Sequence, residues 1–180
     1  AGALKVLVTI TLVCNLVALL LVPGMSLMKG PEELLALTPY ENPLEVPLRV
    51  GIAFVLSWGW VWTAGVYEVV LALFLLFCGI CTAVILWQGR RVLGTILTGA
   101  PFRAENGVSL RRAAVFCFLR SSAALARVVW GLFYYGSVAP LLTYNALFVP
   151  IFILGGLLCL VMSALFRQAA ELKAENDLTI

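Results

Sequence analysis

The sequence contains no histidine and few charged residues. Charged residues make up 12% of its 180 positions, compared with about 25% in soluble domains. The missing histidine removes the most frequent general base and the usual protein ligand of haem and zinc. No serine, cysteine or lysine has a base beside it in sequence, and glycine-rich phosphate loops are absent. We therefore expect no enzymatic activity, no cofactor and no metal site.

Apolar residues, in contrast, make up 63% of the chain. Residues 6–28, 69–89 and 128–166 carry no charge at all, and a membrane-spanning helix needs only about 20 apolar residues. The composition predicts an integral membrane protein of the all-α class, built as one domain over residues 1–180. Its four transmembrane helices are expected at residues 4–22, 66–88, 107–135 and 141–175.

Prolines and short polar motifs mark the expected ends of these helices. Pro23 and Gly24 should stop the first helix, because proline lacks an amide donor and glycine favours a turn. Asn106 should open the third helix as part of an N-cap. Pro150 predicts a kink in the fourth helix, and Gly155-Gly156 offers a smooth patch for a neighbouring helix.

Basic residues are concentrated around the segment that joins the second and third helices. This segment has one acid, Glu105, and its basic residues are Arg90, Arg91, Arg103, Arg111 and Arg112. Because Lys and Arg stay on the cytoplasmic side, the loop at 89–106 should be cytoplasmic. Both termini and the tail 167–180 should then also be cytoplasmic, with residues 23–65 outside.

Large apolar residues occupy every even position from Leu44 to Trp62. A period of two is typical of a half-buried strand, so an extended β segment is predicted at 44–62 on the outer face. Tryptophan and tyrosine favour the headgroup region, and the expected interfacial anchors are Trp58, Trp60, Trp62, Tyr134 and Tyr135. The alternative is a fifth span across residues 50–67, which would place Arg90 and Arg91 outside.

Three ionisable residues lie within or near the predicted spans. Glu68 is close to the outer end of the second helix, and Arg127 is within reach of the same end from the third. Since charges inside a membrane pair with one another, we predict a Glu68–Arg127 ion pair that holds the helices together. A proton or substrate relay would need more than one such pair. Arg120 is closer to the cytoplasm and should extend toward the headgroups.

Two cytoplasmic stretches are candidates for partner binding. Phe102 and Arg103 place an aromatic ring and a cation beside a helix start, although the preferred interpretation is that Phe102 packs under the helices while Arg103 meets lipid phosphates. The tail could be a docking peptide or a solvated helix end, and its candidate residues are Glu175, Asn176, Asp177, Leu178 and Ile180. Cys78 and Cys81 have the spacing of a redox or zinc motif, but an apolar helix favours simple packing.

Three pieces of the sequence resemble a known family. They are residues 99–106 (GAPFRAEN), 110–112 (LRR) and, most specifically, 170–180 (AELKAENDLTI). In these pieces and in its helix order, the chain is similar to the YoaS-like bacterial membrane proteins, small four-helix proteins of unknown function. The resemblance implies the bacterial inner membrane. It also implies a small helix-turn-helix regulator as a partner of the cytoplasmic tail. The tryptophan-rich segment at 44–62 is not part of the resemblance.

These features predict a non-enzymatic membrane protein that acts through protein–protein contacts. The first hypothesis is an accessory subunit of a larger membrane complex, such as a photosynthetic or respiratory one. The alternative is a membrane-bound regulator whose cytoplasmic loop and tail bind a soluble helix-turn-helix partner. A small transporter is a remote third, because the sequence supplies few residues for a polar cavity. We expect contacts with membrane lipid, and none with nucleic acid or a small-molecule substrate.

Overall fold

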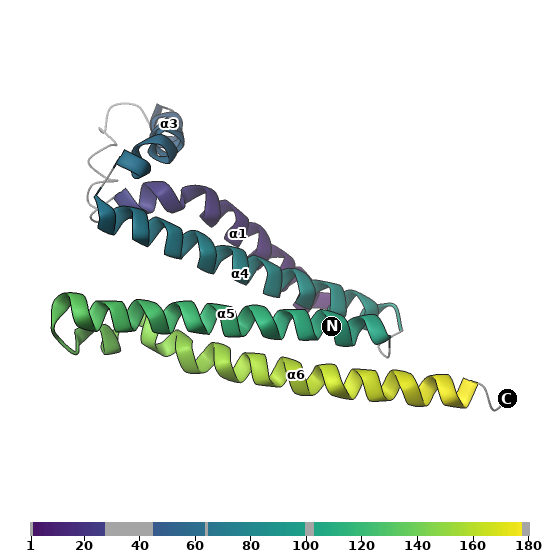
Figure 1. Cartoon of the computed structure of the whole chain (residues 1–180). Coiled ribbons are helices and arrows are strands. Elements are labelled where there is room, and N and C mark those ends of the chain that lie inside the picture. The colour runs from purple at the N-terminus through teal and green to yellow at the C-terminus, as the bar shows by residue number, and fades with distance from the viewer. Residues whose placement is uncertain (1, 28–44, 64, 100–102, 178–180) are drawn as a thin grey trace. The chain divides into compact units, whose positions relative to one another are not determined.

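The computed structural model describes residues 2–27, 45–63, 65–99 and 103–177. Over these ranges every regular element is helical, and no strand is present. The elements, shown in Figure 1, are α1 (Gly2–Leu27), α3 (Glu45–Trp60), η1 (Val61–Thr63), α4 (Val66–Leu97), α5 (Ala104–Tyr135), η2 (Ala139–Leu142) and α6 (Tyr144–Asp177). Four of them, α1, α4, α5 and α6, are long and apolar enough to cross a membrane. The prediction of an all-α chain with four long apolar helices is confirmed over the described residues.

The predicted β segment at 44–62 is wrong for the residues that are described, because Glu45–Trp60 forms helix α3. A single strand at a membrane would leave its amide and carbonyl groups unpaired, whereas a helix pairs them within itself. The alternative of a fifth span at 50–67 is not found either. The helix has 16 residues, about 24 Å at 1.5 Å per residue, so it is shorter than a hydrocarbon core of about 30 Å.

Helix α1 does not stop at Pro23. It continues through the proline to Leu27, and Val22, Pro23 and Gly24 are buried. A proline inside a helix removes one hydrogen bond, and membrane helices tolerate this loss when neighbouring groups satisfy the freed carbonyl. The proline rule therefore placed the end of this helix too early.

The connection between α4 and α5 is shorter than the loop expected at 89–106. Helix α4 continues to Leu97, and Gly99 follows with a φ of +74°. Helix α5 begins at Ala104 with Arg103 as the N-cap residue, and no side chain caps it. Asn106, predicted as part of the cap, lies inside the helix and is 1% exposed.

The described residues form two compact units. The larger unit contains residues 1–15 and 80–180, and its main feature is the antiparallel pair α5 and α6 (Figure 1). Helix α5 ends at Tyr135 because Gly136 adopts a left-handed conformation, φ 59°, and its amide donates to the Leu132 carbonyl. This cap lets the chain turn through η2, whose Pro140 packs against Gly131.

Small side chains form the contact between α5 and α6. The buried residues of α5 recur at intervals of three and four and include Ala113, Cys117, Ser121, Ala124, Val128 and Gly131. Small residues let two helix backbones approach closely, which is how membrane helices gain packing energy. On α6, Gly156 meets Phe118 and Cys117 of α5, since a Cβ at position 156 would lie 3.0 Å from the Phe118 ring.

The smaller unit contains residues 16–79. Its core consists of Val22, Val61 and Ala72, with Leu75 and Leu76 packed against them. The Trp58 indole Nε1 donates a hydrogen bond of 3.0 Å to the Leu20 carbonyl, which attaches α3 to the C-terminal half of α1. This bond gives one tryptophan of the short helix a fixed position.

Candidate functional site

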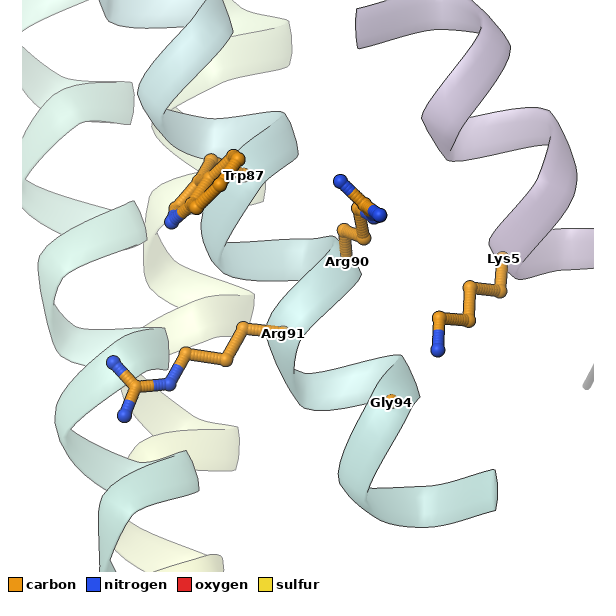
Figure 2. Close-up of a pocket in the computed structure, with 5 residues that line it drawn as sticks. All are labelled: Lys5, Trp87, Arg90, Arg91 and Gly94. Carbon is orange, nitrogen blue, oxygen red and sulfur yellow. The ribbon is translucent and has the colours of Figure 1, made fainter. Parts of the chain in front are cut away.

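A cavity of about 420 Å³ lies in the larger unit, between the start of α1 and the end of α4. Its lining consists of Lys5 from α1 and Trp87, Arg90, Arg91 and Gly94 from α4. Figure 2 shows the Lys5 side chain extending from α1 toward Gly94, with Arg90 on the same side of α4. Three cations therefore border one open cavity, and none of the described residues that line it is acidic.

Helical spacing explains how α4 supplies this lining. Arg90 and Gly94 are four residues apart, as are Trp87 and Arg91, so each pair lies on one side of the helix. Lys5 ends beside Gly94, because a Cβ built at position 94 would lie 3.6 Å from Lys5 Nζ, an ordinary van der Waals contact. The Arg90 guanidinium lies 5.9 Å from the centre of the Trp87 ring, at the outer limit of a cation–π contact.

The side chain of Arg91 points away from Lys5 (Figure 2), and its Nη2 lies 3.3 Å from Glu105 Oε2 of α5. Both side chains are more than half exposed, so this ion pair contributes little stability. One turn further along α4, the Thr95 hydroxyl lies 2.9 Å from Asn106 Oδ1 and donates to it. The two contacts join the end of α4 to the start of α5.

The same end of the unit contains the start of the C-terminal extension of α6. The Ser163 hydroxyl donates a buried hydrogen bond of 2.7 Å to the Gly107 carbonyl of α5. Gly107 also contacts the stem of Arg167, because a Cβ there would lie 3.0 Å from Arg167 Cγ. Beyond this contact α6 continues as a largely exposed helix to Asp177. We call residues 167–177 the C-terminal arm.

The two residues of the predicted ion pair lie in different units. Glu68 lies in the first turn of α4, within the smaller unit, and its carboxylate folds back toward Gly65 at the helix N-terminus. Arg127 lies on α5 in the larger unit, half-buried. The Glu68–Arg127 contact stays a prediction. Arg120 packs its guanidinium over the rings of Phe148 and Phe152, at 5.1 and 5.4 Å from their centres.

The aromatic residues predicted as interfacial anchors are exposed. The exposed fractions of the Trp58, Trp60 and Trp62 side chains are 38%, 61% and 52%. Tyr134 and Tyr135 end helix α5 and contact each other edge to face, with ring centres 5.0 Å apart. Whether these rings lie at headgroup depth stays a prediction.

The partner-binding candidates are only partly described. Phe102, Leu178 and Ile180 lie outside the described residues. Arg103 is exposed at the start of α5, and Glu175 is exposed on the arm. The backbone of Asn176 and Asp177 forms the last residues of α6.

Within the described ranges, no three histidine, cysteine, aspartate or glutamate residues lie close enough to hold a metal ion. Cys78 and Cys81 are both buried, and neither forms a disulfide bond. Cys117 of α5 is buried, and Cys159 of α6 is half-buried. These cysteines pack the helices together.

Sequence reasoning did not identify the cavity. It assigned Arg90 and Arg91 to a cytoplasmic loop and gave Lys5 and Trp87 no role in a site. The available signal was a basic residue just before the first apolar run, together with a Trp-x-x-Arg-Arg sequence at the end of the second. Nothing in the sequence shows that these two helix ends lie side by side.

Comparison with known proteins places the chain in a family. No curated protein and no solved structure matches it. The model of one family, described as "Protein of unknown function (DUF2975)", matches residues 3–180. This match covers nearly the whole chain and includes all four long apolar helices, the cavity and the C-terminal arm. The chain, with its four helices long and apolar enough to cross a membrane, therefore belongs to the DUF2975 family.

Proposed function

We propose that this protein is a non-enzymatic, multi-pass protein of the bacterial inner membrane that works through protein–protein contacts, as an accessory subunit of a larger membrane complex. The contact surface is the tryptophan-bearing helix α3 together with η1. This surface is too short to cross the membrane, yet it is fastened to α1 by the bond from Trp58 to Leu20.

The observation that carries the proposal is the exposure of Trp60 and Trp62, at 61% and 52%. Tryptophan is enriched among the residues that dominate binding energy at protein interfaces. A rigid ring with few rotatable bonds loses little entropy when a partner covers it. Because Trp58 holds the helix, the two neighbouring rings are presented on a fixed support.

The test is purification from native membranes in a mild detergent. The wild-type chain is expected to travel with a partner in fixed stoichiometry, and the double variant Trp60→Ala/Trp62→Ala should lose it. Trp130→Ala is the matched control, because Trp130 is 57% exposed on α5. A homogeneous wild-type monomer, or equal loss of the partner in the control, would contradict the proposal.

A second candidate function is a membrane-bound regulator that binds a soluble helix-turn-helix protein. It is favoured by the C-terminal arm, a polar helix on which Leu172 is 62% exposed. It is also favoured by the likeness of residues 170–180 to the tail of the YoaS-like proteins, a narrower group than the family match supports. An apolar side chain on an otherwise polar, exposed helix can anchor the groove of a partner.

The two candidates predict different results for one deletion. Removal of residues 167–180 should abolish capture of a soluble partner while leaving membrane insertion and any membrane partner in place. The substitution Leu172→Ala should weaken the same capture, with Ala174→Gly as a control for loss of helix stability. If a membrane partner is lost with the tail and no soluble protein is captured, the regulator is excluded.

A further inference from the structure

We propose that the cavity between α1 and α4 binds a phosphate group, and we expect the headgroup of an anionic phospholipid to supply it. This inference goes beyond the proposed function and does not depend on it. It starts from the lining, in which three cations and an aromatic ring surround about 420 Å³ of open space. Basic pockets between membrane helices are a known means of binding anionic headgroups.

Two of the cations are available to a ligand. Arg91 is engaged by Glu105, whereas no ion pair among the described residues takes the Lys5 ammonium or the Arg90 guanidinium. Figure 2 shows these two side chains approaching from facing helices, Lys5 from α1 and Arg90 from α4. An arginine can bind two phosphate oxygens at once, and a lysine adds a point charge.

Gly94 provides the space between the cations. Gly94 lines the cavity without a side chain, and an ideal Cβ built there would lie 3.6 Å from Lys5 Nζ. A larger residue would occupy the place where a phosphate must lie. The glycine therefore keeps open the space beside the two cations.

The surroundings favour a lipid over a free anion. Trp87 is 56% exposed at the last apolar turn of α4 before the arginines, and tryptophan prefers headgroup depth. On α1, Val6 and Leu7 are both 59% exposed directly after Lys5. A phospholipid whose phosphate is held by Lys5 and Arg90 would thus lay its acyl chains along these apolar surfaces.

The experiment uses the full-length protein, reconstituted in micelles with equal amounts of phosphatidylglycerol and phosphatidylcholine. Native mass spectrometry counts the lipids that remain bound. The wild type should retain phosphatidylglycerol preferentially, and Lys5→Gln/Arg90→Gln should reduce this retention by about tenfold or more, since each cation near an anionic headgroup contributes severalfold. The control Arg111→Gln/Arg112→Gln removes the same charge from exposed positions outside the cavity and should stay within about twofold.

A steric pair of variants tests the cavity without changing charge. Gly94→Leu should displace phosphatidylglycerol, whereas Gly89→Leu should not, because a Cβ at position 89 has no atom within 4 Å. Circular dichroism and size-exclusion chromatography check that each variant is folded. If both charge variants lose lipid equally, or if Gly94→Leu retains it fully, the inference is overturned.

A competition arm separates the two sources of phosphate. If excess inorganic phosphate leaves the phosphatidylglycerol adducts in place, the ligand is a lipid headgroup. If it displaces them from the wild type, the cavity binds a free phosphate group, and the same loss in Lys5→Gln/Arg90→Gln then supports the inference with that ligand. If inorganic phosphate displaces the lipid and then binds the double variant as well as the wild type, the cavity is not the site.

Discussion

Individual glycines decide how closely α5 and α6 pack. Gly155 and Gly156 are neighbours on α6, but only Gly156 faces α5, where a Cβ would lie 3.0 Å from the Phe118 ring and 3.3 Å from Cys117 Cβ. A Cβ at Gly155 has no atom within 4 Å. The sequence showed the two glycines as one smooth patch, and the structure assigns the contact to the second.

The substitution Gly156→Val should lower the stability of the protein in detergent by about 1–3 kcal/mol, because the added atoms overpack the contact. Gly155→Val changes the same residue type in the same helix and should have a much smaller effect. Thermal unfolding followed by circular dichroism measures both. Equal unfolding temperatures for the two variants would show that Gly156 is not in the helix contact.

Removal of the Ser163 hydroxyl should destabilise the protein by about 0.5–1.5 kcal/mol, the net value of a typical hydrogen bond. Its bond to the Gly107 carbonyl is buried and links α6 to α5. Ser122→Ala is the control, because the Ser122 hydroxyl is exposed and bonds only to the Phe118 carbonyl of its own helix. The free energy of unfolding of Ser163→Ala and Ser122→Ala is compared in one detergent, and a larger loss for Ser122→Ala would contradict the assignment.

The helix α3 shows why the period of two was misleading. Alternation predicts that Ser57, Gly59 and Val61 share one face, but in the structure Ser57 and Val61 are buried while Gly59 between them is exposed. Burial at a spacing of four is helical. Large residues at even positions fit either pattern when most of the segment is apolar, so alternation alone could not distinguish the two structures.

A spin-label scan across this segment distinguishes the helix from a strand. Nitroxides attached through cysteine at positions 57 and 61 should be immobilised, and one at position 59 should move freely. In a strand all three would behave alike, because residues two apart point to the same side. Electron paramagnetic resonance line widths give the answer, and equal mobility at the three positions would contradict α3.

The junction of α4 and α5 depends on a contact that no local rule could show. Asn106 has the residue type and place of an N-cap, but its Oδ1 accepts from Thr95 of the preceding helix. The start of α5 was therefore predicted within a few residues, whereas the role of Asn106 was not. The cavity could not be predicted from the sequence either, because Lys5 and Arg90 come together only through folding.

A double-mutant cycle with Thr95→Val and Asn106→Ala should give a coupling energy of about 0.5–1.5 kcal/mol, the value of the hydrogen bond they share. The control cycle replaces Thr95→Val with Thr98→Val. The Thr98 hydroxyl bonds to the Thr95 carbonyl and is exposed, so its coupling to Asn106 should be near zero. The unfolding free energies of the single and double variants give the coupling energy of each cycle. A coupling energy of zero in the first cycle would contradict the Thr95–Asn106 hydrogen bond.

The fold class and the number of long apolar helices were the features best predicted from the sequence. Long uncharged runs produce four long apolar helices because a helix alone satisfies its backbone within lipid. The cavity places Lys5 near Arg90 and Arg91, and Arg91 pairs with Glu105 close to Gly107, which Arg167 contacts. These basic residues therefore gather at the end of the larger unit where α4 ends and α5 begins. By the positive-inside rule we predict that this end faces the cytoplasm.

This orientation can be measured with a membrane-impermeant maleimide. A cysteine placed at Arg103 should react only after the inner membrane is permeabilised, and one at Thr63 should react in spheroplasts. The wild-type chain, with its five native cysteines, sets the background. The reverse labelling pattern would show that the protein has the opposite orientation in the membrane. A soluble cytoplasmic regulator would then have no access to the C-terminal arm.

The anchoring of the C-terminal arm has a mechanical consequence. Ser163, one turn before the arm, and Arg167, its first residue, hold α6 against Gly107. Gly107 is adjacent to Asn106, which Thr95 ties to α4 one residue from Gly94. A pull on the arm would thus reach α4, the helix that carries Arg90, through the Ser163–Gly107 bond, the peptide bond between Gly107 and Asn106, and the Asn106–Thr95 bond.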